Sequence, residues 1–289
     1  MEQNCTECDF AGADSWVILS PIEQSIKRKI EAIGKPLKDW DINIYRGVLT
    51  GCNEAFIISK QIRDEILGNC QTPDEYDRTA ALIRPILRGR DIKRYSYDWA
   101  NLWLINSHNG IKGKIPRINI DEYPAVKAHL DKYWSKIKNR ADQGDTPYNL
   151  RNCAYLEDFF NQKIVWARLM RMTRSDIDAF PRFCAIPPGY FTVDSLCFFS
   201  GNNVEYLLSV LNSDYAAYYF FNNVATLDNG GFQMRQQYVE NIPIPPETSI
   251  GNPMLTFGFT DSEIEYINEY IKMRKREILK SDDEQQINS

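Results

Sequence analysis

The sequence predicts an α+β protein, and three observations lead to that prediction. Hydrophobic residues make up 43% and charged residues 25% of 289 residues, a composition typical of a globular chain with an ample core. Helical and strand-like periodicities both occur, without the strict βαβ alternation of a parallel α/β fold. No internal repeat or low-complexity stretch is present. The length allows one large domain or two ordinary ones.

The first predicted helix spans Ser20 to Leu37. Ser20 is a plausible N-cap, Pro21 occupies the first helical position and Glu23 the third, where a capping-box acid belongs. A strand over Ile42–Val48, a glycine-rich turn and a second strand over Ala55–Ile58 follow. The next expected elements are a helix over Lys60–Gly68, a buried apolar run over Ala80–Ile86, a strand over Leu102–Ile105 and a helix over Tyr123–Arg140.

The second half of the chain also mixes the two periodicities. Strands are expected over Lys163–Met170 and Phe191–Phe199, and helices over Val204–Tyr219 and Ser262–Leu279. Pro243, Pro245 and Pro246 remove backbone donors, so the last strand must lie at a sheet edge or leave the sheet.

The bulk properties exclude several classes of protein. No apolar run approaches the roughly 18 residues of a membrane span, and no secretory signal is visible, so we expect a cytoplasmic protein. The close pair Cys5 and Cys8 has no second pair at zinc-finger distance, so no metal site is predicted. The net charge of −5 argues against attraction of nucleic acid to the whole surface, but a local cluster of Lys and Arg can still bind it.

Motifs for catalysis are missing. A methyltransferase that uses S-adenosylmethionine needs a glycine-rich loop and a polar residue before Pro-Pro-Tyr, and Ile186–Tyr190 lacks that residue. No phosphate-binding loop occurs either. We therefore predict no catalytic residue. The alternative is a magnesium-dependent nuclease in which Asp74 and Asp91 hold the metal and Lys93 assists the attacking water.

The strongest candidate site is the basic segment Ile83–Tyr95. Gly89 permits a tight turn near phosphate, and the surrounding cations can bond to phosphates or to guanine edges. The candidate DNA-binding residues here are Arg88, Arg90, Lys93, Arg94 and Tyr95. A solvated strand–turn–strand with exposed charges is the alternative interpretation.

Three further segments offer candidate contacts. In Tyr45–Phe56, Arg46 and Asn53 are candidates, whereas Gly47 and Gly51 suit a structural turn equally well. In the loop 228–237, paired donors and acceptors of amide and guanidinium groups suit base edges. The candidates in that loop are Asn229, Gln233 and Arg235, and Lys163 is added from the strand that it begins.

These segments resemble a known family. The Pro-Ile-Leu-Arg-Gly-Arg-Asp-Ile-Lys-Arg-Tyr run, the Leu-Asn-Ser helix end at 211–213 and the closing Ile-Pro-Ile-Pro-Pro at 242–246 resemble the TaqI-like C-terminal specificity domain. That domain belongs to type II, type IIG-like, restriction–modification proteins and adenine-specific DNA methyltransferases. The resemblance covers roughly residues 40 to 246.

The resemblance implies a fold of the target-recognition-domain type, α+β with mixed, mainly antiparallel sheets and peripheral helices. It implies recognition of double-stranded DNA and leaves the chemistry to a methyltransferase, and possibly an endonuclease, domain or subunit. S-adenosylmethionine and magnesium would belong to that partner, and no cofactor to this chain. The chain lacks the catalytic parts of the family, so it is either a fragment or a separate specificity subunit.

We accordingly divide the chain into three parts: an N-terminal arm and linker helix over 1–39, a DNA target-recognition domain over 40–250, and a C-terminal helix and polar tail over 251–289. A protein-interaction domain of a larger assembly, with its acidic surface and terminal helices as docking elements, is the third possible function.

Overall fold

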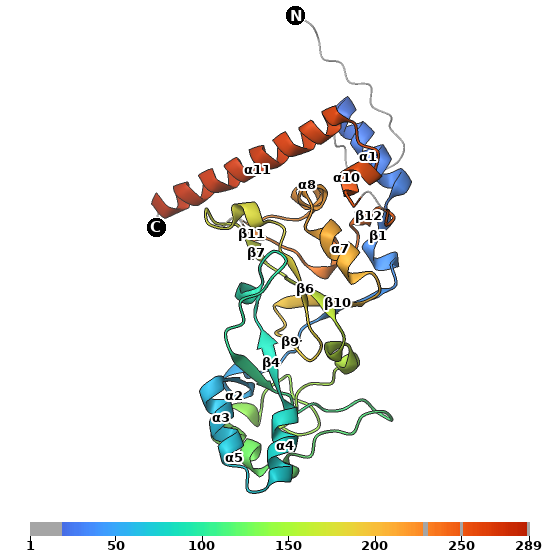
Figure 1. Ribbon diagram of the computed structural model, residues 1–289. Helices are drawn as coiled ribbons and strands as arrows, with labels where there is room; N and C mark the ends of the chain where they lie inside the picture. Colours follow the sequence, from blue (N-terminus) through green and yellow to red (C-terminus); the bar gives the residue numbers. More distant parts are fainter. Residues whose placement is uncertain (1–18, 228–230, 249–250, 288–289) are drawn as a thin grey trace, which may run out of the picture.

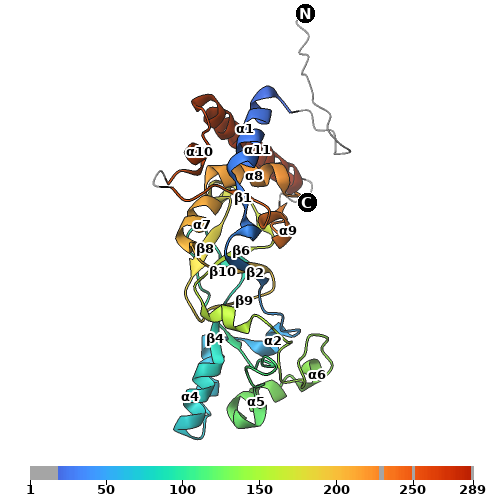
Figure 2. The same cartoon turned by 90° about the vertical axis from the view of Figure 1, so that its right-hand side faces the viewer.

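Two four-stranded sheets organise the part of the chain that the computed structural model describes, residues 19–227, 231–248 and 251–287, with side chains up to residue 280. Each sheet belongs to one of two lobes stacked along a long axis (Figure 1). The upper lobe contains the sheet β2–β10–β6–β8, and the lower lobe contains the sheet β3–β5–β4–β9. The two lobes meet at a narrower waist near β4 and β9 (Figure 2).

The upper sheet is antiparallel throughout. Its strands are β2 (Ile42–Arg46), β10 (Leu196–Gly201), β6 (Lys163–Ala167) and β8 (Phe183–Ile186). Every side chain of β6 is buried, because β6 is an inner strand with both faces covered. The alternation of inward and outward residues that was expected for this strand is therefore absent.

The lower sheet is antiparallel except that β9 runs parallel to β4. Its strands are β3 (Ile57–Ser59), β5 (Leu102–Ile105), β4 (Ile83–Leu87) and β9 (Phe191–Thr192). The helices around it are α2 (Asn53–Phe56), α3 (Lys60–Gly68), α4 (Pro73–Leu82), α5 (Pro124–Asp131) and α6 (Trp134–Ile137). After β9 the chain passes through residues 193–195 directly into β10, so this link joins the two sheets.

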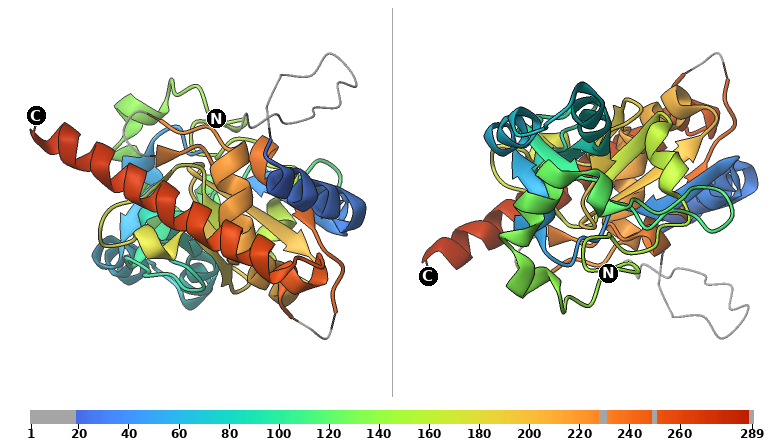
Figure 3. Two further views of the ribbon diagram at one scale, coloured as in Figure 1. Left: turned by 90° about the horizontal axis from the view of Figure 1, so that it is seen from above. Right: turned by 90° about the horizontal axis from the view of Figure 1, so that it is seen from below.

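Helices surround the upper sheet. They are α1 (Pro21–Ile33), α7 (Val204–Leu211), α8 (Asp214–Asn223), α9 (Gln236–Val239), α10 (Pro253–Thr256) and α11 (Asp261–Ile287). Helix α11 crosses the top of the lobe over α8 and continues past the body (Figure 3). It is tied to α1 by the carboxylate of Glu263, which accepts from Ser25 Oγ at 2.7 Å and from Lys29 Nζ at 2.6 Å.

Short elements complete the fold. The two-residue strands form the pairs β1 (Lys35–Pro36) with β12 (Pro243–Ile244), and β7 (Met170–Arg171) with β11 (Gly231–Phe232). The 3-10 turns are η1 (Leu37–Asp39), η2 (Gly89–Asp91), η3 (Ile120–Glu122), η4 (Leu156–Phe160) and η5 (Ile177–Ala179). As the prolines predict, β12 pairs only with β1 among the described residues and stays outside the large sheets.

The predicted α+β class, with mainly antiparallel sheets and peripheral helices, is confirmed. The expected helix over Val204–Tyr219 is instead two helices, because Asn212 turns its amide to the backbone of Phe183 and Ser213 then caps α8. The helix expected over Tyr123–Arg140 is likewise divided into α5 and α6. The strand expected to begin at Ala55 is a helical turn before β3.

Asp74, a metal ligand in the nuclease alternative, lies in the first turn of α4. Thr72 caps this helix by accepting from the backbone of Glu75, and Pro73 takes the first helical position. No helix in the described part of the chain combines the length and apolarity that crossing a bilayer requires.

Candidate nucleic-acid interface

Basic and amide side chains from distant segments meet in a groove at the lower edge of the upper sheet. Two adjoining pockets form this groove, and both are lined by Arg168 and Arg235. We call it the arginine groove. Its basic and amide side chains are Arg46, Arg168, Gln233, Arg235, Gln236 and Gln237, and the carboxylates of Asp194 and Glu240 also line it.

The topology of the sheet explains why two of the arginines meet. Arg46 ends β2 and Arg168 follows β6, and both strands are antiparallel to β10, which lies between them. Their ends therefore lie at the same edge of the sheet, beside the link that precedes β10. Arg168 donates from Nη1 to the carbonyl oxygen of Asp194 at 3.2 Å, and Arg46 Nη2 lies 3.7 Å from the carboxylate of the same residue. Asp194 thus orients both guanidinium groups.

A buried anchor presents Gln233 and Arg235 to the groove. Met234 between them is fully buried, and its carbonyl oxygen accepts from Trp166 Nε1 at 2.8 Å. The two flanking side chains both line the groove. Arg235 is exposed, and its guanidinium has no bonding partner among the described residues. It is therefore available for a ligand.

The basic segment Ile83–Tyr95 does not present all its cations outward. Arg88 binds the buried carboxylate of Asp91 with two bonds, Nη2 to Oδ1 at 2.8 Å and Nε to Oδ2 at 3.2 Å. Arg94 donates to the backbone carbonyls of Asn212 and Asp178. Both guanidinium groups therefore already bond to groups of the chain itself and stabilise the fold, and DNA contact by these two partly buried side chains stays a prediction.

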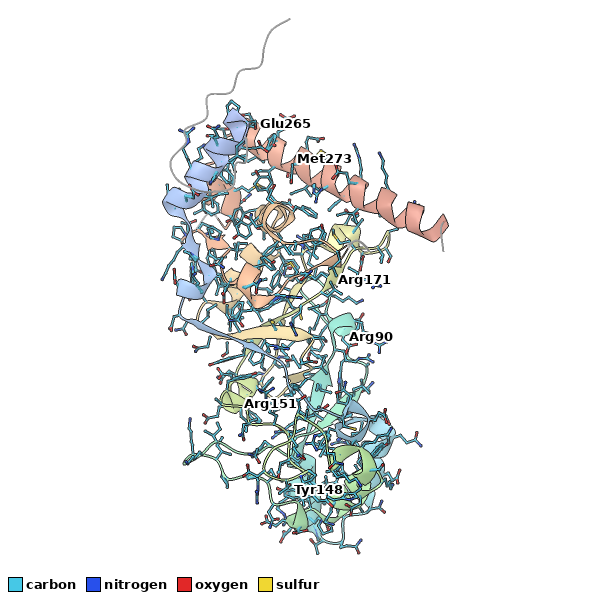
Figure 4. The ribbon with its side chains drawn as sticks, turned by 180° about the vertical axis from the view of Figure 1, so that it is seen from behind. Arg90, Tyr148, Arg151, Arg171, Glu265 and Met273 are labelled. Atoms are coloured by element: carbon cyan, nitrogen blue, oxygen red, sulfur yellow. The ribbon has the colours of Figure 1, made fainter. Side chains whose placement is uncertain are left out.

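The other three members of the segment lie at the surface. Arg90 is exposed, has no bonding partner within the described residues, and points outward on the same flank as Arg171 (Figure 4). Lys93 lies 3.9 Å from the carboxylate of Asp98, and Tyr95 is half exposed with a left-handed φ of 65°. Of the segment's four predicted cations, Arg90 is the one that remains a strong candidate.

Of the three glycines in the candidate segments, the fold requires two and would accept a side chain at the third. A Cβ on Gly47 would lie 2.1 Å from the carbonyl oxygen of Val193, and Gly51 has a φ of +66°, so both are required by the fold. A Cβ on Gly89 would lie 3.7 Å from Ala167 Cβ, an ordinary contact, and its φ is not left-handed. The tight turn expected at Gly89 therefore does not require glycine.

Two further predicted DNA contacts are not in the groove. Lys163 is wholly buried and donates from Nζ to the carbonyl oxygen of Asn161 at 2.8 Å, so it cannot reach a phosphate. Burial lowers the pKa of this lysine to about 7, although the charge of Asp158 acts in the opposite direction. Asn53 is exposed on α2 in the lower lobe, where its side-chain oxygen accepts from Thr50 Oγ1 at 2.6 Å.

Some predictions concern residues outside the described part of the chain, namely Asn229 and the pair Cys5 and Cys8. The nuclease alternative can be compared with the structure. Asp74 lies in the first turn of α4, at the far end of the lower lobe, whereas Asp91 lies in η2, directly after β4 at the waist (Figure 1). The carboxylate of Asp91 also already accepts hydrogen bonds from Arg88. In the described residues no group of three or more His, Cys, Asp or Glu is placed to hold a metal ion.

A larger pocket, of about 700 Å³, lies in the lower lobe beside residues 109–117. Two of its cations are paired, since Lys114 bonds to Glu157 and Arg117 lies 3.4 Å from Asp145, whereas the exposed Lys112 has no bonding partner within the described residues. The arginine groove is the better candidate for an anionic ligand, because three arginines, Arg46, Arg168 and Arg235, line it together.

Of the basic residues in and after this strand, the sequence analysis selected Lys163 and not Arg168 as a DNA contact. In an extended strand the two side chains would point to opposite faces, but β6 ends at Ala167, one residue before Arg168. One signal in the sequence could have indicated Arg168: it directly follows a predicted strand, and Arg46 lies near the end of another. Only the pairing of both strands with β10 shows that the two arginines lie at the same edge of the sheet.

Comparison with known proteins identifies the family of the chain. A family model described as the TaqI-like C-terminal specificity domain matches residues 84–244, more than half of the chain. The chain belongs to this family. The match includes Gly89, Arg168, Gln233 and Arg235 of the groove, and the predicted specificity domain of a restriction–modification protein is confirmed.

Relatives of this TaqI-like specificity domain are longer proteins. The Type II methyltransferase M.BstVI of Geobacillus stearothermophilus is 22% identical over 260 residues, which cover 84% of this chain and 40% of the relative. Thus the chain spans 40% of the length of that protein. Among solved structures, the type IIG restriction endonuclease BpuSI matches 86% of this chain and 28% of its own, with a TM-score of 0.46 and 17% identity. The match to the type IIL restriction–modification enzyme MmeI, solved in complex with DNA, covers 64% of this chain and 22% of the MmeI chain, with a TM-score of 0.44 and 12% identity.

Proposed function

We propose that the arginine groove is the surface through which this specificity domain reads double-stranded DNA. The observation that carries the proposal is the convergence of Arg46, Arg168 and Arg235, from three segments, at one edge of one sheet. Guanidinium groups form paired, charge-assisted bonds with phosphates and with guanine edges. The net charge of −5 makes a local cluster necessary, because the protein as a whole repels DNA.

The groove residues have different roles in this proposal. Asp194 restrains Arg168 and Arg46, which suits contacts to the DNA backbone that set the register. Gln233 and Arg235 are held by the buried Met234 between them, which suits base edges: the amide pairs with adenine and the guanidinium with guanine. Arg90 on the outer flank adds a phosphate contact.

The chemistry would come from a partner. The relative with 22% identity is a Type II methyltransferase, and this chain matches 40% of it. We assign the catalytic role to a methyltransferase, and possibly an endonuclease, domain or subunit that uses S-adenosylmethionine and magnesium. In this arrangement the specificity domain holds the duplex while the partner receives a flipped adenine.

A selection from randomised duplexes, followed by binding titrations on the enriched sequence, tests the proposal. The double variant Arg168→Ala, Arg235→Ala should lower affinity by at least about tenfold and reduce the slope of log K against log salt by about 0.9 for each lost phosphate contact. The matched control is the double variant Lys27→Ala, Arg28→Ala, which also removes two positive charges, but from exposed positions on α1 at the top of the upper lobe.

Two results would contradict the proposal. If the groove double variant bound DNA with the affinity and salt dependence of the wild type, the groove would not be part of the DNA interface. Failure of the wild-type chain to enrich any duplex would favour the protein-interaction alternative.

A further inference from the structure

Part of the lining of the arginine groove is apolar. Ala167, Leu169 and Leu227 line the pocket that also contains Arg168, Gln233 and Arg235. We call these three residues the apolar floor. Leu169 is 42% exposed and lies in a pocket that arginine and amide side chains also line.

The local chain path explains the position of Leu169. The next residue, Met170, is fully buried, and the preceding residue is fixed by a bond from Arg168 N to the carbonyl oxygen of Ser195 at 2.9 Å. Leu169 therefore lies between two anchored residues and is left on the groove side. Single exposed leucines are common, so its exposure alone indicates no function. Its position in a polar pocket is what distinguishes it.

Gly89 keeps the space beside the apolar floor open. A Cβ at this position would make only ordinary contacts, 3.7 Å from Ala167 Cβ and 3.7 Å from Ser195 Oγ, and the backbone conformation is not left-handed. The fold therefore accepts a side chain here. A methyl group on Gly89 would, however, occupy space directly beside Ala167 in the groove.

We propose that the apolar floor receives the 5-methyl group of a thymine in the major groove, while Gln233 or Arg235 bonds to an adjacent base edge. This inference rests on the proposed DNA-binding function and makes it more specific. The thymine methyl is the apolar feature that base pairs present in the major groove, and small aliphatic side chains contact it. Arg168 and Arg235 supply the charge that brings the duplex to this floor.

The experiment replaces each thymine of the selected duplex with deoxyuridine, one at a time, which removes a single methyl group. With the wild-type chain, one position should show a loss of affinity of roughly fourfold, the value for one buried methyl. Leu169→Ala should bind the thymine duplex more weakly and lose the preference for thymine over uracil at that position.

Two further variants complete the test. Leu255→Ala is the matched control, since Leu255 is a 49% exposed leucine on α10, outside the groove, and it should retain the thymine preference. Gly89→Ala should fold with unchanged stability and reduce the thymine preference, because its methyl group fills the space that the base needs.

The outcomes separate this inference from the proposed function. Binding that depends on Arg168 and Arg235, but changes by less than about twofold at every uracil position, overturns the methyl contact and leaves the DNA-binding proposal intact. A duplex that carries 2-aminopurine fluoresces more strongly when its bases unstack. If binding raised this fluorescence only when Leu169 is present, and no thymine preference were seen, the leucine would be a wedge that unstacks bases, and the inference would again be overturned. No binding to any duplex would overturn both.

Discussion

The basic segment Ile83–Tyr95 and the arginine groove place their cations in two different ways. The segment has many cations close together in sequence, yet Arg88 and Arg94 bond to groups of the protein itself. The groove draws its arginines from distant segments, and Arg235 has no partner among the described residues. Charge density along a sequence is therefore a poor guide to a binding surface, because the bonding partners of each cation decide its role.

The largest expected effect tests the internal role of Arg88. Arg88→Ala leaves the carboxylate of Asp91, which is 3% exposed, without its cation and should lower the free energy of unfolding by about 3 kcal/mol. Arg90→Ala, two residues away, should change it by less than about 0.5 kcal/mol. Urea unfolding measures both. Equal effects would show that the division of this segment into inward and outward cations is wrong.

The next effect separates base contact from phosphate contact at Arg235. Arg235→Lys keeps the charge but loses the planar pair of donors. It should retain the salt dependence of binding and lose about 1–3 kcal/mol of discrimination at one base pair. Affinities for single-base variants of the selected site give the answer. A uniform loss over all sequences would instead place Arg235 on a phosphate.

A smaller effect concerns the buried Lys163, whose pKa falls from an ordinary 10.5 to about 7. Above pH 7 the folded state releases this proton while the unfolded state keeps it, so the unfolded state binds more protons and stability rises with pH up to about 10.5. The wild type should gain about 1 kcal/mol over Lys163→Met between pH 7 and pH 8 in urea unfolding. A constant difference would mean that the lysine is solvated. DNA affinity should not change in this variant, since Lys163 is buried.

The smallest effect compares the groove with the larger pocket of the lower lobe. Lys114→Ala removes an exposed cation that is paired with Glu157, and DNA affinity should change by less than about 0.5 kcal/mol. Binding titrations at several salt concentrations measure this. A loss as large as that from the groove variants would extend the interface into the lower lobe.

Local signals in the sequence predicted local structure well. The capping box of Ser20 and Glu23, the helix Lys60–Gly68 and the strand Leu102–Ile105 all lie where the sequence places them, because each depends on neighbours in the chain. The periodicity of 204–219 did not predict the break at Asn212, since that break depends on a bond to Phe183 in a distant strand, and only the resemblance indicated a helix end at 211–213.

The candidate site was only partly predictable for the same reason. Arg235 and Gln233 were found from side-chain chemistry, but their place in a groove with Arg168 depends on strand pairing. Lys163 was assigned to DNA because strand alternation assumes one solvated face, and β6 is covered on both faces. Tertiary pairing thus decided which cations meet and which are buried.

Asp194 lies on the three-residue link 193–195 between a strand of the lower sheet and a strand of the upper sheet. It also holds Arg46 and Arg168. The segment that joins the two sheets is thus also the common partner of two groove arginines, so a change in the conformation of residues 193–195 would move the bonding partners of both guanidinium groups together.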